Sequence, residues 1–203
     1  MLKKIALGFS IILHPLLMPT IGIAIMLNSG SFPFEIPYAT KKILIILFCS
    51  GTFILPVLMM PLFYMSRVIS DVQLSVLKQR LLPISITLIF YLLTYLLMLR
   101  VPVYRFIHAF MLGSLIEVVV VLIISFKWKI SIHMIALGGL TAFLFIFSFI
   151  HSINLFPYLI MSIMASGIAG TSRLILNAHK PAEVYAGYVT GIIVMAGFLF
   201  LFY

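Results

Sequence analysis

The sequence predicts an all-α integral membrane protein, a polytopic bundle of about six or seven transmembrane helices in a single domain over residues 1–203. Of the 203 residues, 64% are hydrophobic and only 8% are charged, whereas about a quarter are charged in an ordinary soluble domain. Apolar runs long enough to cross a bilayer, which takes about 20 residues as a helix, recur along nearly the whole chain. The alternating pattern of a transmembrane barrel is missing. Helices, which satisfy their own backbone hydrogen bonds, are therefore the expected spanning elements.

Hydropathy predicts seven spans joined by short polar connections. They cover residues 5–28, 43–65, 82–99, 106–126, 133–151, 155–171 and 183–203. The first apolar run follows two lysines, as a signal peptide would, but Pro15 and Pro19 interrupt it and no small-residue cleavage pattern follows. We therefore expect a retained first helix.

The net charge of +9 comes from 13 Lys and Arg against four acids. Basic residues at the ends of membrane helices contact lipid headgroups, and no basic run is interleaved with aromatics as in single-strand binders. We expect membrane lipids and no nucleic acid as partners. The single cysteine, Cys49, excludes an intrachain disulfide and a cysteine-based metal cluster. With so few acids, no metal and no cofactor is expected, and the oligomeric state stays open.

Three of the connections are predicted to lie on the same membrane face as the N-terminus, because each span carries the chain across once. They contain "KQRLLP", "KWKISIH" and "SRLILNAHKPAE". The polar residues that they bring to this face are Lys78, Arg80, Lys127, Lys129, His133, Arg173, His179, Lys180 and Glu183. Cations and two histidines from distant parts of the chain thus converge, which is typical of an anion-binding site.

The connection before the last span combines a helix start with polar side chains. Pro181 suits the first helical position, where a missing N–H is tolerated, so the last helix should begin just after His179. Gly187 and Gly191 lie four residues apart, which lets another helix approach closely. The helix N-terminus offers free N–H groups to an anion, and Arg173 adds a planar fork that suits phosphate.

His179 and Glu183 form a candidate nucleophile and its holder. A neutral histidine can attack with one ring nitrogen when an acceptor holds the other, and a carboxylate four residues along a helix can be that acceptor. Taken singly, Arg173, His179 and Lys180 also fit ordinary interfacial residues that reach toward headgroups. Their joint spacing favours a site.

This spacing resembles the last signature of the type 2 phosphatidic acid phosphatase superfamily, the membrane lipid phosphatases related to vanadium haloperoxidases. The signature reads S-R, five residues, H, three residues, D-V, two residues, G, three residues, G. Every spacing is matched, with Glu183 in place of Asp, by Ser172, Arg173, His179, Glu183, Val184, Gly187 and Gly191. The resemblance implies that His179 is the nucleophile, that Glu183 orients it, and that Ser172 and Arg173 belong to the phosphate site.

The middle signature of that superfamily, P-S-G-H, has a partial counterpart in "KISIHM". Ser131 and His133 stand at the right separation, while Ile130 and Ile132 occupy the Pro and Gly positions. The resemblance implies that Ser131 binds phosphate and that His133 protonates the leaving oxygen. Lys129, directly before this segment, is a further candidate phosphate ligand.

The first signature, Lys, six residues, Arg-Pro, is matched only loosely. Arg80 has Pro83 three residues on, and Gln73 stands where the signature has Lys. We predict that Arg80 binds phosphate and that Lys78 is a substitute cation. The alternative for Lys78 is a solvated loop residue.

The resemblance implies hydrolysis of a lipid phosphomonoester or isoprenoid pyrophosphate through a phosphohistidine. One alternative is a catalytically degenerate relative that binds or transports a phospholipid, and another is a structural or transport protein with interfacial residues only. Glu117 is an acid inside a span and hence a functional candidate, with His14 and His108 as possible partners. Its alternative is a protonated side chain bonded to a neighbouring helix.

The orientation in the membrane depends on how the cations are counted. The predicted site face holds nine Lys and Arg and the other face four, which would make the site cytoplasmic. Without Lys78, Arg80, Lys129 and Arg173, which phosphate binding would explain, the count is five against four and decides nothing. The resemblance implies a bacterial inner membrane protein with its site facing the periplasm.

Overall fold

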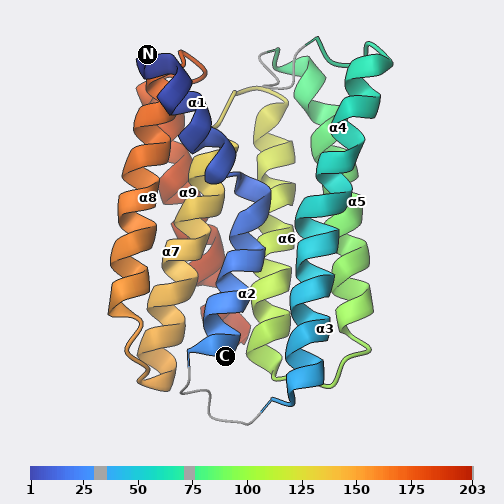
Figure 1. Cartoon of the computed structure of the whole chain (residues 1–203), viewed down its shortest axis with the longest axis vertical. Helices are drawn as coiled ribbons and strands as arrows, with labels where there is room; N and C mark the ends of the chain where they lie inside the picture. Colours follow the sequence, from blue (N-terminus) through green and yellow to red (C-terminus); the bar gives the residue numbers. More distant parts are fainter. Residues whose placement is uncertain (30–35, 71–75, 203) are drawn as a thin grey trace.

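The computed structural model describes residues 1–29, 36–70 and 76–202, and these residues form helices and no strand. Gln73 lies outside them. Seven helical segments are long and apolar enough to cross a membrane, and they stand side by side in one bundle (Figure 1). The predicted all-α, polytopic membrane fold is confirmed.

The described α-helices have the following bounds: α1 Leu2–Ile12, α2 Met18–Asn28, α3 Tyr38–Phe48, α4 Leu55–Met65, α5 Leu81–Met98, α6 Arg105–Ser125, α7 Ile132–His151, α8 Phe156–Ile175 and α9 Pro181–Phe202. The turn Cys49–Ile54 has π-helical geometry and joins α3 to α4 into one span. The sixth span was predicted to end at residue 171, but α8 continues to Ile175 and carries Arg173 in its last turn. The last helix begins at Pro181, directly after the polar connection, as predicted.

The first span is broken, whereas the sequence predicted one helix. α1 ends at Ile12, a 3-10 turn follows at Pro15–Leu17, and α2 continues across the membrane. His14 is extended, with φ −63° and ψ 131°, because the residue before a proline avoids the helical region. Pro15 also has no N–H to give to a helix that arrives from α1. The break leaves the His14 side chain on an internal cavity.

α7 and α9 pack with their backbones almost in contact. A Cβ atom on Gly191 of α9 would overlap the backbone of Ile135, and one on Gly138 of α7 would overlap the carbonyl oxygen of Tyr188. A Cβ on Gly187 would lie 2.8 Å from the carbonyl oxygen of Ser131. The close helix approach that the glycine spacing predicted is therefore present, and it fixes the start of α9 beside the start of α7.

One end of the bundle holds the connections that were predicted to lie on the same membrane face as the N-terminus. Figure 1 shows the N-terminus, the connection from α6 to α7 and the connection from α8 to α9 at the same end. α5 begins at this end as well, and the C-terminus lies toward the opposite end. Residues from distant parts of the sequence can therefore meet around one site.

Candidate active site

The polar end of the bundle encloses a cavity of about 480 Å³. It lies within the 300–1,000 Å³ range of ordinary ligand sites. The predicted site residues that line it are Arg80, Lys129, His133, Arg173 and His179. The structure thus brings at least one basic residue from each of the three connections to one space.

His179 is held through its Nδ1 atom. This nitrogen lies 2.9 Å from Oε2 of Glu183 and 3.0 Å from the backbone oxygen of Lys129. A carbonyl oxygen can only accept, so Nδ1 carries the proton and shares it between the two oxygens. In the neutral ring Nε2 then holds the lone pair. The arrangement leaves this second nitrogen as a nucleophile.

The surroundings of His179 favour the neutral ring. Burial, with the nearby cations Arg173 and Arg80, lowers the pKa of His179 to about 4 from its ordinary 6.5, although the hydrogen bond to Glu183 opposes this shift. The side chain is only 3% exposed, so the charged form is poorly solvated. Near neutral pH the ring is therefore in the form that can attack an electrophile.

Glu183 also caps the helix that carries it. Its Oε2 accepts the backbone N–H of Lys180 at 3.1 Å, as a glutamate in the third position of a helix does in a capping box. Its backbone oxygen accepts the N–H of Ser131 at 3.2 Å, which ties α9 to the start of α7. One residue thus orients His179, closes the helix start and joins two helices. Glutamate therefore serves in the orienting position where the superfamily signature has aspartate.

Two buried arginines lie on the cavity without an ion pair to any described carboxylate. Arg173 is 6% exposed and Arg80 is 3% exposed. Arg173 donates from Nη1 to Ser10 Oγ at 2.8 Å, and Arg80 donates from Nη2 to the backbone oxygen of Ile130 at 3.0 Å. Nε of Arg173 and Nη1 of Arg80 have no partner. Buried cations with unused donors are unfavourable without a counterion, so the pair is a candidate binding site for an anion.

His133 lies on the cavity but directs one nitrogen toward α1. Its Nε2 is 3.1 Å from the backbone oxygen of Ser10 and 3.3 Å from Ser10 Oγ. Since the carbonyl oxygen accepts, Nε2 carries the proton of the neutral ring. A proton for a ligand must then come from Nδ1, which requires the doubly protonated ring. The role of acid predicted for His133 fits this geometry only in that form.

Three predicted phosphate ligands are placed away from the cavity lining. Ser172 donates its hydroxyl to the backbone oxygen of Ile168 on its own helix, at 2.8 Å. Lys78 is exposed. Ser131 is fully buried and its hydroxyl has no partner. Adjacent helical residues differ by about 100° in direction, which explains why Arg173 faces the cavity while Ser172 does not.

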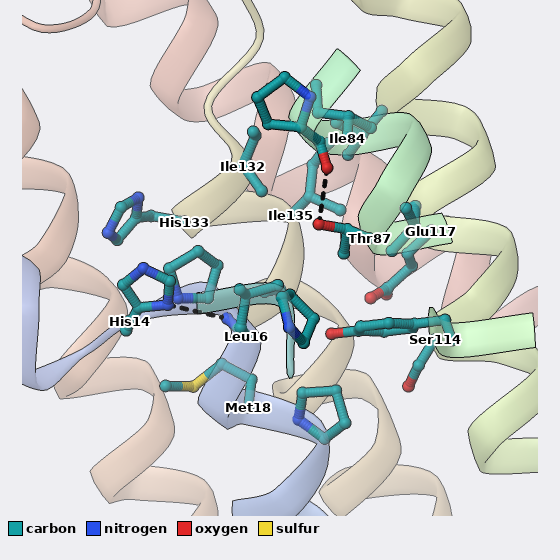
Figure 2. Close-up of a pocket in the computed structure, with 18 of the residues that line it drawn as sticks. His14, Leu16, Met18, Ile84, Thr87, Ser114, Glu117, Ile132, His133 and Ile135 are labelled. Atoms are coloured by element: carbon teal, nitrogen blue, oxygen red, sulfur yellow. Dashed lines mark hydrogen bonds between the residues drawn. The ribbon is translucent and has the colours of Figure 1, made fainter. Parts of the chain in front are cut away.

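Ser10 and His14 line the cavity as well, although neither residue was predicted to belong to the phosphate site. The ring centroids of His14 and His133 are 6.1 Å apart, and Figure 2 shows both rings on one side of the cavity. Nδ1 of His14 accepts the N–H of Leu16 at 3.4 Å, so Nε2 carries the proton of the neutral ring. The one sequence feature that could have indicated His14 is that it is a polar residue directly before a proline, inside an apolar run.

Glu117 of α6 lines the same cavity. It is 7% exposed, and its Oε1 atom has no hydrogen-bond partner. The carboxyl group lies against Gly139 of α7, where any Cβ atom would overlap it. Of its two suggested partners, His14 lies beside His133 and His108 does not line the cavity.

The described residues include no group of three His, Cys, Asp or Glu side chains that could together hold a metal ion. The donor set at the polar end of the cavity is instead cationic and imidazole-rich, which suits an anionic ligand. Comparison of the chain with models of protein families, with curated proteins and with solved structures finds no match.

Proposed function

We propose that the protein is a membrane phosphatase that hydrolyses a lipid phosphomonoester or an isoprenoid pyrophosphate through a phosphohistidine. The observation that carries this proposal is the meeting of a histidine held at Nδ1 with two buried arginines that have unused donors. A nucleophile beside an anion site is the minimum that phosphoryl transfer by a histidine requires. The resemblance of residues 172–191 to the phosphatase signature adds independent support.

The reaction has two steps in this site. Nε2 of His179 forms a bond to phosphorus while the bond to the leaving oxygen breaks, and the bonding electrons stay on that oxygen. His133, as the doubly protonated ring, gives the Nδ1 proton to the leaving oxygen and keeps Nε2–H on Ser10. Water then attacks phosphorus and loses a proton to His133. The phosphorus–nitrogen bond breaks and releases inorganic phosphate.

The surrounding charges lower the barrier to this transfer. Arg173 and Arg80 balance the charge on the equatorial oxygens, and Lys129 lines the same space. Glu183 stabilises the positive ring that forms when Nε2 bonds to phosphorus. Such fixed charges act strongly where water is excluded.

The decisive experiment measures phosphate release by the purified protein in detergent micelles. The substrates are phosphatidic acid, an isoprenoid pyrophosphate and a water-soluble phosphomonoester. The wild-type protein should release phosphate and incorporate ³²P from labelled substrate into an acid-labile, base-stable adduct, and His179→Ala should do neither. If the wild-type protein releases no phosphate from any of them, the enzyme proposal is wrong.

A second candidate is a relative that binds or transports a phospholipid without hydrolysis. The observations that favour it are the engagement of Nε2 of His133 with Ser10 and of the Ser131 N–H with the Glu183 backbone oxygen. Both groups would serve the phosphate in an active phosphatase of this type. In this case lipid phosphates would bind to the wild-type protein, Arg173→Gln would weaken their binding, and no phosphate would be released.

For the cellular location we propose a bacterial inner membrane, with the site opening to the periplasm. The support is the resemblance, since the cation count decides neither way once phosphate ligands are removed. Lys127 is exposed in the connection between α6 and α7. A Lys127→Cys variant in a Cys49→Ser background should react with a membrane-impermeant maleimide in intact cells whose outer membrane admits the reagent. Reaction only after lysis would place the site in the cytoplasm.

A further inference from the structure

The cavity extends from the phosphate site to a second polar region deeper in the bundle. Glu117, Ser114 and Thr87 line this region, and Figure 2 shows them on the side opposite to His14 and His133. The Glu117 carboxyl lies against Gly139. Gly139 is six residues beyond His133 on α7, a rise of about 9 Å at 1.5 Å per residue. The two polar regions therefore belong to one space but lie at different depths.

The two regions differ in the polar atoms that the structure leaves without a partner. At the phosphate end, Arg80 and Arg173 present N–H donors without partners. At the deep end, Thr87 donates its hydroxyl proton to the backbone oxygen of Pro83 at 2.9 Å, and Ser114 donates to that of Phe110 at 3.0 Å. Both hydroxyl oxygens can then face a ligand only as acceptors. The Oε1 atom of Glu117 adds a further acceptor without a donor.

An unsatisfied acceptor at this depth is unfavourable unless a ligand supplies the donor. A buried polar atom without a hydrogen bond loses on the order of 1–3 kcal/mol, and an acid inside a membrane span marks a functional site by default. Gly139 leaves room for the carboxyl group where any other residue would displace it. The remaining lining is mainly apolar, including Ile84, Ile135 and Met195, and this suits a hydrocarbon segment between the two polar regions.

We propose that Glu117, with Thr87 and Ser114, forms a subsite for a hydroxyl or amino group on the substrate lipid. The cavity then selects amphiphiles that carry a phosphate at one end and a hydrogen-bond donor further along the molecule. This inference deepens the proposed function and rests on its phosphate site. Lipids with a phosphate but without such a donor lack the contact with Glu117 and bind less tightly.

The test compares lipids that differ only in the donor. An alkyl phosphate with a hydroxyl group on its chain, about 9 Å from the phosphate, is paired with its deoxy analogue of the same chain length, and the corresponding amino-substituted alkyl phosphate supplies the amino group. For each lipid, kcat/KM for phosphate release and the apparent Kd from thermal stabilisation in detergent are measured. The wild-type protein should bind at least one donor-bearing lipid about tenfold more tightly than the deoxy analogue, as for one additional buried hydrogen bond.

Substitutions connect this preference to the subsite. Glu117→Leu should reduce the preference to less than twofold, whereas Glu117→Gln, which keeps an acceptor oxygen, should retain part of the preference. Thr87→Val removes one acceptor and should weaken the preference. Thr94→Val is the matched control, because Thr94 bonds to Phe90 on the same helix at 2.7 Å and does not line the cavity.

The two readouts separate the subsite from the enzyme activity. Equal affinity and equal kcat/KM for all lipids would overturn the subsite and leave the phosphatase proposal intact, as would a preference that Glu117→Leu preserves. A preference in binding that depends on Glu117, without phosphate release, would support the subsite and overturn the phosphatase proposal. No binding of any of the lipids would overturn both.

Discussion

Arg173 Nη1 donates to Ser10 Oγ at 2.8 Å and so joins the end of α8 to α1 across 163 positions of the sequence. Ser10 also contacts His133 through its backbone oxygen and its hydroxyl. One small residue of the first span therefore contacts both the proposed phosphate-binding arginine and the proposed acid. The first span is thus part of the site and not only of the membrane anchor.

Replacing Ser10 with alanine tests this link. The Ser10→Ala variant leaves another Arg173 donor without a partner, while His133 keeps its contact with the backbone oxygen. Loss of a hydrogen bond to a charged group typically weakens binding about tenfold, so we expect KM for phosphate release to rise by about that factor. Ser50→Ala is the control, because its hydroxyl bonds to Ile46 in its own span at 2.7 Å. Equal KM values for Ser10→Ala and wild type would contradict a role for this residue.

Glu183 should matter for turnover more than for folding. In Glu183→Gln the amide oxygen can still accept the Lys180 N–H and cap α9, but the charge that stabilises the His179 ring is lost. We expect kcat to fall on the order of hundredfold or more, by analogy with removal of the charge from a catalytic triad, with little change in melting temperature. Phosphate release and thermal unfolding in detergent measure the two effects. A kcat within threefold of wild type would mean that Glu183 is only a structural cap.

The part of the site that the sequence predicted is the part made by neighbouring residues. His179 and Glu183 are four residues apart at the start of one helix, so their spacing alone brings the side chains together, and they lie 2.9 Å apart. The close approach of another helix at the two glycines of α9 was likewise predicted from their four-residue spacing on one helix. The helical bundle followed from hydropathy because a span has few other ways to satisfy its backbone.

The contacts of Ser10 and His14 could not be predicted, because they depend on how α1 packs against α7 and α8. No local sequence pattern specifies that packing. Hydropathy also does not predict the break between α1 and α2 at Pro15. The same limit applies to Ser172 and Ser131, which stand at signature positions but do not line the cavity. A signature gives a spacing, whereas the direction of each side chain depends on the helix that carries it.

The acid limb of the pH profile of activity should follow the lowered pKa of His179. Only the neutral ring can attack, so kcat/KM should fall as the pH drops through about 4 instead of through about 6.5. Arg173 contributes to the lowering, so Arg173→Gln should move this acid limb to higher pH in addition to reducing the rate. The measurement is the pH profile of kcat/KM for each protein between pH 3.5 and 8, in steps of about half a unit. An acid limb that stays in place in Arg173→Gln would contradict the electrostatic contribution.

His179 also makes the free energy of unfolding depend on pH. The folded-state pKa lies below the unfolded value of 6.5, so the unfolded chain binds the proton more readily. Above pH 6.5 His179 adds nothing to the pH dependence of the free energy of unfolding, because its ring is neutral in both the folded and the unfolded state. Between pH 6.5 and about 4 the free energy of unfolding should decrease as the pH falls. In His179→Gln this part of the pH dependence should disappear, which thermal unfolding at several pH values would detect; an unchanged slope would contradict it.

The last prediction concerns the helix contact that holds the site together. In Gly191→Ala the new Cβ meets the backbone of Ile135, which cannot move without displacing α7. Overpacking of this kind destabilises by about 1–3 kcal/mol, and phosphate release should fall because His133 and His179 lie at the starts of α7 and α9. Gly197→Ala is a matched control on the same helix, because its Cβ would meet nothing within 4 Å. There the better helix propensity of alanine should raise the melting temperature or leave it unchanged. Equal melting temperatures for the two variants would show that the backbones of α7 and α9 are not in close contact.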